Sequence, residues 1–316
     1  MKQATPSNAP PADFPIMRST SKRVRRAQPL LGTIVEVDAV VPDPAGTKAV
    51  DAAFDAVARV HRVMSAHDPA SDVGRLNRFG AHTVVQVHPW TWQVLAIARQ
   101  ISAAAGGVFD VSVAPALAQF GYLPPIEHQV ERGAGWRAID LLPAYAVRFS
   151  ESIAIDLGGI AKGFAVDRAA DALRAHGVTD FVVNAGGDLR VGTGRETINV
   201  RHPARPSHLI PLAELSNAAV ATSATYFAAK KWNGSLVHPI VVPHTGACAE
   251  FDGSVTVLAS ECVVADALTK VVAILGEASG PVLARFGAEA CVITHRGHVT
   301  RIFATAEAAR MQRCAA

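Results

Sequence analysis

The chain has 316 residues, half of them hydrophobic and 18% charged, which is enough to bury a sizeable core in one large domain or two small ones. Its formal net charge of +3 is too small to indicate a nucleic-acid-binding protein, and no stretch approaches the roughly 20 apolar residues of a membrane-spanning helix. The four cysteines form no CxxC pair, which favours reduced thiols in a cytoplasmic protein over disulfides or a zinc site.

The N-terminal segment is polar and rich in proline, so residues 1–24 are predicted to be a disordered tail and residues 25–316 a single domain. The segment has no apolar core of the kind that secretory signals carry. The dense basic run SKRVRRAQ, residues 21–28, is interpreted as a solvated flank of the domain.

The first part of the domain is predicted to hold one strand followed by helices. Residues 30–41 are rich in β-branched side chains and bounded by proline and glycine, which is typical of a strand. Apolar residues recur at helical spacing over residues 47–65. Ser71 is expected to cap a short helix that runs through Leu76, and residues 88–107 form another helix that ends at two glycines.

The second part mixes strands with two more helices. A helix is predicted over residues 163–175, a strand, glycine turn and strand over 180–194, and a helix over 261–275. Short strands are expected from residue 216 onward, and a hairpin over 288–305 closes the domain. Because successive strands are close enough to pair directly, we predict an α+β fold with mixed, largely antiparallel sheets flanked by helices.

The stretch IDLGGIAKG, residues 155–163, places a carboxylate and a cation around bare backbone at the start of a helix. Gly158 and Gly159 let a ligand approach the backbone closely, and Lys162 adds a positive charge for an anion such as phosphate. Asp156 can accept hydrogen bonds from a hydroxyl or ring N–H group. The stretch matches neither common nucleotide-binding glycine motif, and a capped helix with a surface Asp–Lys pair remains an alternative.

A second polar cluster lies on the predicted helix 261–275. Asp266, Thr269 and Lys270 share one face at i, i+3 and i+4 spacing. A carboxylate on such an apolar helix needs a partner. That partner is either Lys270, in an ion pair, or a hard cation with Thr269 as a second oxygen ligand.

Three further stretches carry polar groups beside glycine or proline. Asp110 follows Phe109, which is either core or the wall of a ring pocket. Asn184 and Asp188 flank two glycines and are interpreted as residues of a hairpin turn. His238 is a candidate proton shuttle or a polar turn residue.

The order of the motifs along the chain is more specific than any one of them. In succession the chain reads LGTIVEV, MSAHDPASDVGRLN, GGVFDVSVAPAL, IDLGGIAKGFAVDRAADAL, VVNAGGDLRVGTG, AVATSATYF, HPIVVPHTG and VTVLASECVVADALTKVVAILG. From about residue 29 to 295, this succession resembles the ApbE family of FAD:protein FMN transferases. The resemblance implies an ApbE-like fold with a cleft for FAD.

The resemblance also implies a reaction and its participants. Family members transfer FMN from FAD to a threonine or serine of an acceptor flavoprotein and release AMP, with Mg²⁺ as the metal. The expected cofactors are therefore FAD and Mg²⁺, and the expected partner is an acceptor flavoprotein. Two alternatives are a non-catalytic FAD-binding or flavin-delivery protein and an FAD pyrophosphatase. Typical members are exported lipoproteins, whereas no lipobox cysteine is found here, so we expect a cytoplasmic location.

Roles for individual residues are carried over on the matching motifs. The residues implied to contact FAD are Leu31, His67, Val108, Phe109, Asp110, Asp156, Lys162 and Ile240. The implied metal ligands are the carbonyl of Gly159 and the side chains of Asp266 and Thr269. The implied catalytic residues are His238, as a base, and Lys270.

The chain departs from the family pattern at the metal segment. The family usually has threonine as a magnesium ligand four residues after the aspartate, and here that position is Lys270. An ammonium group cannot ligate a metal, but it can neutralise a pyrophosphate. Alternatively, Thr269 could take over ligation after a small rotation of the helix.

Overall fold

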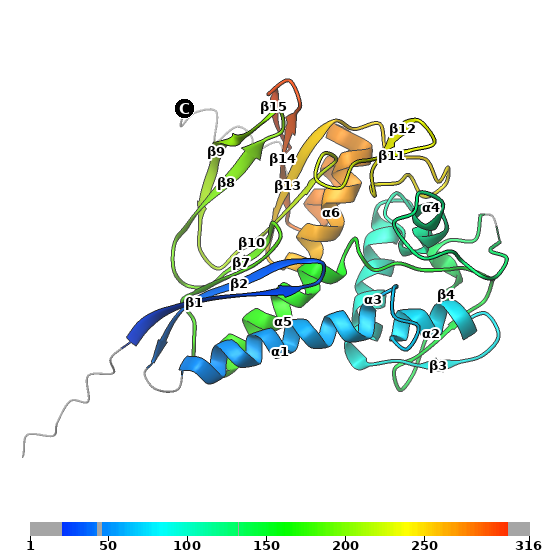
Figure 1. Ribbon diagram of the computed structural model, residues 1–316, viewed down its shortest axis with the longest axis horizontal. Helices are drawn as coiled ribbons and strands as arrows, with labels where there is room; N and C mark the ends of the chain where they lie inside the picture. The colour runs from blue at the N-terminus through cyan, green and yellow to red at the C-terminus, as the bar shows by residue number, and fades with distance from the viewer. Residues whose placement is uncertain (1–20, 43–45, 132, 303–316) are drawn as a thin grey trace, which may run out of the picture.

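The computed structural model describes residues 21–42, 46–131 and 133–302, and its centre is an eight-stranded sheet (Figure 1). The strand order is β1-β2-β6-β7-β10-β13-β14-β15, and each neighbouring pair runs antiparallel. Its members after the first two strands are β6 (Phe181–Ala185), β7 (Asp188–Val191), β10 (Ala219–Ala224), β13 (Gly253–Ala259), β14 (Glu289–Thr294) and β15 (Val299–Ile302). The prediction of an α+β fold with largely antiparallel pairing is confirmed.

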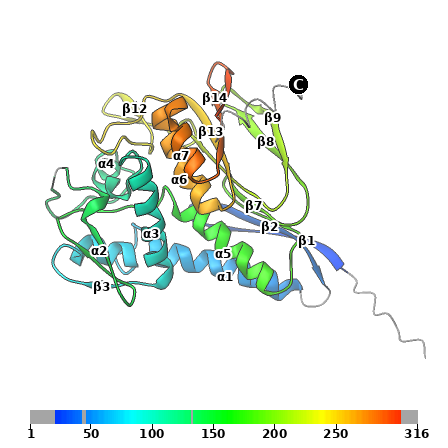
Figure 2. The ribbon, with the colours of Figure 1, turned by 180° about the vertical axis from the view of Figure 1, so that it is seen from behind.

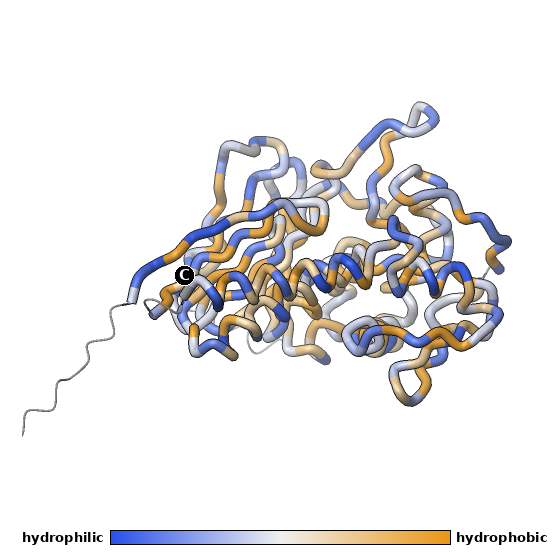
Figure 3. Tube along the Cα trace, turned by 60° about the horizontal axis from the view of Figure 1, so that its bottom comes forward, coloured by the Kyte–Doolittle hydropathy of each residue, from blue (hydrophilic) through white to orange (hydrophobic). Residues whose placement is uncertain are grey.

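The first two strands form a hairpin, which differs from the sequence prediction of one strand after a solvated basic flank. The strands β1 (Ser21–Leu30) and β2 (Thr33–Pro42) pair through their whole length. Residues 21–24, assigned above to the tail, therefore begin β1, and the rest of the predicted tail lies outside the described residues. The alternating exposure of the basic run suits a largely hydrophilic edge strand (Figure 3).

Three helices pack together beside the sheet: α1 (Gly46–Met64), α5 (Ala161–Ala175) and α6 (Cys262–Leu275). The helix α5 contacts α1, α6 and the strands β6 and β7, while α6 contacts β10 and β13 (Figure 2). The predicted helical spacing of apolar residues is confirmed, because Val50, Val57 and Val60 of α1 are fully buried. Helices α5 and α6 thus bring the two polar clusters of the sequence to one place.

A second group of elements lies beyond the end of α1 (Figure 1). It contains α2 (Asp72–Phe79), α3 (Pro89–Ala104), α4 (Ala114–Gln119) and a small sheet of order β3-β5-β4, formed by β3 (Val85–Gln86), β4 (Ile139–Leu142) and β5 (Ala146–Phe149). The predicted cap is present, since Ser71 Oγ accepts a hydrogen bond from Gly74 N at 2.9 Å. The strands β4 and β5 were not predicted from sequence.

The remaining strands form two hairpins, and one further short α-helix lies near the C-terminal end of the described residues. They are β8 (Glu196–His202) with β9 (Arg205–Leu215), β11 (Lys230–Trp232) with β12 (Ser235–Val237), and α7 (Gly280–Arg285). The predicted final hairpin is confirmed as β14 with β15. Within the described residues, no helix combines the length and apolar character required to cross a bilayer.

Candidate functional site

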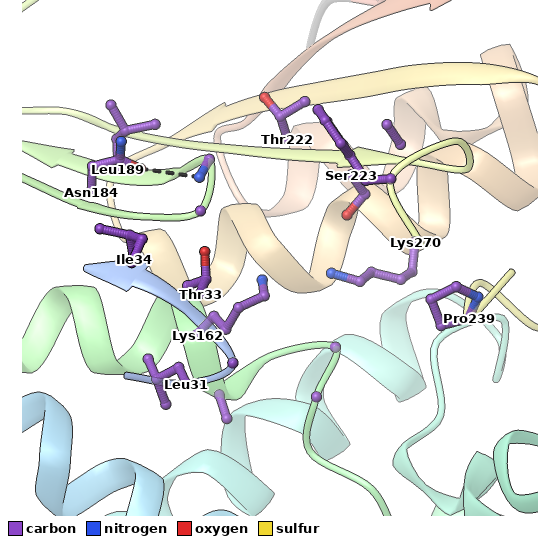
Figure 4. Close-up of a pocket in the computed structure, with 18 of the residues that line it drawn as sticks. Leu31, Thr33, Ile34, Lys162, Asn184, Leu189, Thr222, Ser223, Pro239 and Lys270 are labelled. Atoms are coloured by element: carbon purple, nitrogen blue, oxygen red, sulfur yellow. Dashed lines mark hydrogen bonds between the residues drawn. The ribbon is translucent and has the colours of Figure 1, made fainter. Parts of the chain in front are cut away.

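A cleft of about 1400 Å³ opens between the large sheet and the segment that leads into α5. Its walls come from the β1–β2 turn, the end of α1, the β6–β7 turn, β8, β10 and α6. Figure 4 shows Lys162 and Lys270 extending into this space with their ammonium ends pointing toward one another. The cleft is large enough for a ligand the size of a dinucleotide.

One wall is the turn before α5, where Asp156, Gly158 and Gly159 line the cleft. Asp156 Oδ2 accepts a hydrogen bond from Gly158 N at 3.0 Å, and Asp156 N donates to Val111 O at 2.8 Å. A Cβ atom on Gly158 would lie 2.8 Å from Asp156 Oδ2, so the absence of a side chain at residue 158 leaves room for the Asp156 carboxylate beside the turn. Burial raises the pKa of Asp156.

Lys162, in the first turn of α5, lies between two buried carboxylates. Its Nζ is 2.5 Å from Asp188 Oδ2 and 3.6 Å from Asp266 Oδ2. The two carboxylates are 1% and 0% exposed, whereas the lysine side chain is 31% exposed. The Lys162 ammonium group therefore neutralises buried negative charge, and the solvent-exposed part of its side chain faces the cleft.

Asp266 of α6 is fully buried and contacts both lysines that line the cleft. Its Oδ1 forms an ion pair with Lys270 Nζ, and its Oδ2 accepts a hydrogen bond from Gly163 N at 3.1 Å. Thr269 Oγ1 donates to the Asp266 carbonyl at 2.6 Å and lies 2.7 Å from Ser223 Oγ. Of the two partners that the sequence allowed for Asp266, the ion pair with Lys270 is present.

The two buried carboxylates of this cluster differ in acidity because they contact the lysines differently. Burial and the neighbouring Asp266 raise the pKa of Asp188 to about 7, against the effect of Lys162. Burial also acts to raise the pKa of Asp266, but the ammonium groups of Lys162 and Lys270 outweigh it and lower that pKa to about 2. Asp266 is thus held ionised between the two cations.

This depressed pKa predicts a specific acid dependence of stability. Because the folded-state pKa of Asp266 is about 2 and its ordinary value is 3.8, its contribution is complete above about pH 4 and is lost as the pH falls toward 2. We expect Asp266→Asn to lower the free energy of unfolding by about 2 kcal/mol above pH 4 and by much less near pH 2. Urea unfolding at a series of pH values measures this.

The matched control is Asp140→Asn, which removes a carboxylate paired with Arg148 at 2.8 Å on the surface. It should change the free energy of unfolding by less than about 1 kcal/mol. A loss for Asp266→Asn that stays the same from pH 2 to pH 6 would contradict the predicted role of its ionisation.

Val108, Phe109 and Asp110 line a smaller cavity of about 50 Å³ that shares Asp156 and Gly159 with the cleft. Asp110 Oδ1 accepts from Ser112 N at 2.8 Å and its Oδ2 from Trp136 N at 2.9 Å. Both carboxylate oxygens of Asp110 are thus bonded to backbone N–H groups. Burial raises the pKa of this carboxyl group. Phe109 is mostly buried and belongs to the core as well as to the cavity wall.

The other predicted contacts fall into two groups. Leu31, His67 and Ile240 line the cleft. Leu31 adopts a left-handed backbone conformation, with φ of 55°, which costs about 1–2 kcal/mol for a residue with a side chain. His238 does not line the cleft, although its neighbours Pro239 and Ile240 do. Its Nε2 is 3.1 Å from Ala249 O, and burial lowers its pKa.

A family model described as the ApbE family matches residues 31–292. The chain belongs to the ApbE family. The resemblance seen in the sequence is therefore confirmed over most of the chain.

Two curated relatives illustrate the similarity of this ApbE family chain to known proteins. The FAD:protein FMN transferase of Vibrio cholerae is 26% identical over 283 residues, covering 84% of this chain and 85% of the relative. The protein of the same name from Haemophilus influenzae is 27% identical over 241 residues, covering 69% and 70%.

Solved ApbE structures have the same fold. The ApbE protein of Thermotoga maritima superposes with a TM-score of 0.78 at 25% identity, covering 89% of this chain and 97% of that one. The apo flavinyl transferase ApbE of Pseudomonas stutzeri gives a TM-score of 0.75 at 23% identity, covering 90% and 98%. The second likeness shows the fold alone.

Sequence reasoning missed several residues of this ApbE site. Asp188 was interpreted as a turn residue, but it is the direct partner of Lys162. Asn184 does act in the turn, since its Oδ1 accepts from Gly187 N at 3.0 Å, and it also lines the cleft (Figure 4). Thr222 and Ser223 of β10 add hydroxyl groups to the wall. The VVNAGGD stretch carried the signal for Asp188, and Thr222 and Ser223 lie in the AVATSATYF motif, to which no residue role was assigned.

Proposed function

We propose that this chain is an FAD:protein FMN transferase, which moves FMN from FAD to a threonine or serine of an acceptor flavoprotein. The observation that carries the proposal is the pair of lysine ammonium groups, Lys162 and Lys270, directed into a dinucleotide-sized cleft of an ApbE family protein. Curated relatives that align over most of their length carry this activity as their name.

The proposed reaction is a displacement at phosphorus without any redox change. The acceptor hydroxyl oxygen attacks the phosphorus of the FMN half, the bond from that phosphorus to the bridging oxygen breaks, and AMP leaves with the bridging oxygen. The hydroxyl proton passes to a base. Such a reaction needs positioning and charge neutralisation more than a strong nucleophile.

Different residues of the cleft are suited to charge neutralisation and to positioning. The lysine ammonium groups are suited to neutralise the diphosphate, and the exposed backbone at Gly158 and Gly159 allows it to approach closely. Leu31 and Ile240 offer apolar walls for the ring systems. The titratable side chains that line the cleft include His67 and Asp156. The assignment of the base to His238 stays a prediction.

The residues expected to hold Mg²⁺ do not fit that ion in this structure. Both carboxylate oxygens of Asp266 are engaged, one of them by an ammonium group, and the hydroxyl of Thr269 is bonded on two sides. Within the described residues, no group of three or more His, Cys, Asp or Glu side chains is arranged to hold a metal. No step of the proposed reaction is therefore derived through Mg²⁺.

The test is to incubate the purified full chain with FAD and a flavoprotein domain that carries a threonine or serine flavinylation site, then to weigh the domain. A mass increase equal to one FMN group, lost when that threonine or serine is changed to alanine, is the expected result. AMP and free FMN without labelling would indicate a pyrophosphatase instead. Bound FAD that stays intact would indicate a flavin-binding protein.

A further inference from the structure

The ion pair between Asp266 and Lys270 occupies the position at which the family resemblance implied a metal. Lys270 Nζ pairs with Asp266 Oδ1 and also donates to the Asp266 carbonyl at 3.0 Å. The same side chain lines both the cleft and the smaller cavity next to Asp110. A positive charge is thus already built into the wall where a dinucleotide would present its phosphates.

The geometry leaves little room for a metal at this carboxylate. A Mg²⁺ ion binds oxygen at about 2.0–2.1 Å and needs near-octahedral ligands. Here Asp266 Oδ1 contacts one ammonium group, and Asp266 Oδ2 lies 3.6 Å from the Nζ of Lys162. A divalent cation would have to displace Lys270 against the repulsion between like charges.

The ammonium group of Lys270 retains capacity for a ligand. An ammonium has three N–H donors, and two of them are used on Asp266. Among the described residues, no other hydrogen-bond partner of Nζ is observed. Figure 4 shows this end of the side chain in the cleft, pointing toward Lys162. The third donor is therefore available to a phosphate oxygen.

We propose that Lys270 serves as a built-in cation that replaces the divalent metal at the diphosphate of FAD, so that this chain binds FAD without Mg²⁺. The proposal rests on the proposed function for the identity of the ligand. In it, Asp266 orients Lys270 through two contacts, and Lys162 supplies the second ammonium group from α5. The carboxylate that would otherwise hold a metal instead holds a lysine.

The first test uses the unmodified full chain. FAD binding is measured by calorimetry in excess MgCl₂ and again in EDTA, after the protein has been stripped of metals by dialysis. We expect the two dissociation constants to agree within about twofold, because a ligand that does not require the ion gains nothing from it. Binding that is lost in EDTA and restored by MgCl₂ would overturn the proposal.

The second test changes the cation itself. Lys270→Met keeps most of the side-chain volume and removes the charge, so FAD binding should weaken by about tenfold or more with and without MgCl₂. Lys270→Thr removes the charge but adds a hydroxyl group next to the freed Asp266 Oδ1. In that variant FAD binding should be weak in EDTA and should recover in MgCl₂.

Thermal unfolding of both variants, followed by circular dichroism, checks that they are folded before binding is compared. Folded Lys270→Met protein that binds FAD as well as the unmodified chain does would contradict the role of the ammonium group. Failure of MgCl₂ to restore binding to folded Lys270→Thr protein would contradict the claim that lysine and metal compete for one position.

Acceptor labelling and FAD binding together distinguish the role of Lys270 from the transferase activity. If no acceptor is labelled but FAD binds equally well in EDTA and MgCl₂, the transferase assignment fails and the role of Lys270 stands. If an acceptor is labelled only when MgCl₂ is present, and FAD binding shows the same requirement, the transferase assignment stands and the role of Lys270 fails.

Discussion

Replacing Lys162 with methionine is expected to lower the free energy of unfolding by about 3 kcal/mol and to abolish measurable FAD binding. The substitution leaves Asp188 and Asp266 close together, buried and without the ammonium group that lies 2.5 Å and 3.6 Å from them. We place the expected loss at the lower end of the range for buried pairs because 31% of the lysine side chain is exposed to solvent. Urea unfolding and FAD titration measure the two effects.

A double variant separates the structural effect from the binding effect. Lys162→Met combined with Asp188→Asn removes the carboxylate that the single variant leaves without its ion-pair partner, so part of the lost stability should return. FAD binding should not return, because the double variant still lacks the cation that faces the cleft. A single variant as stable as the unmodified chain would contradict the view that Lys162 holds the two carboxylates together.

Gly163→Ala is expected to be the second most damaging change, with a loss of about 3 kcal/mol in the free energy of unfolding. A Cβ atom at this position would lie 2.2 Å from the carbonyl oxygen of Cys262 and 2.8 Å from Asp266 Cβ. The helices α5 and α6 can approach each other here only because residue 163 has no side chain. Their separation would also lengthen the 3.1 Å hydrogen bond from Gly163 N to Asp266 Oδ2.

The matched control is Gly280→Ala at the start of α7. No atom outside the adjacent residues lies within 4 Å of the Cβ position there, and the φ angle of −47° is helical, although Pro281 disfavours this conformation slightly for a preceding residue with a Cβ. This control should change the free energy of unfolding by less than about 1 kcal/mol in either direction, because the gain from a less flexible unfolded chain and the cost of a Cβ before proline oppose each other. Urea unfolding of both variants gives the comparison, and equal effects at the two glycines would refute the close-packing argument. FAD binding should weaken only in Gly163→Ala.

Local sequence patterns predicted the elements whose formation depends on near neighbours. The apolar spacing of α1, the Ser71 cap of α2 and the helical stretch of α6 are all confirmed. In each case the hydrophobic period or the cap involves residues only a few positions apart. The basic run is largely exposed, as predicted, but it forms the strand β1 because it pairs with β2, which composition alone did not indicate.

The candidate site was predicted in part. The order of motifs indicated the family and pointed to Asp156 and Lys162, both of which line the cleft. It also pointed to His238, which does not line it. Asp188 was assigned only to a turn, because its contact with Lys162 spans 26 residues and forms between a helix and a strand.

By itself, the sequence determined which residue types are available to this protein, including a lysine four residues after Asp266, where the resemblance implied a threonine. It also allowed two partners for Asp266, Lys270 or a cation. Only the tertiary structure shows the surroundings of that carboxylate, because the packing of α5 against α6 at Gly163 brings a second lysine and a backbone N–H group to it. The charge and donors around a buried group depend on such packing, which residue spacing along one helix does not specify.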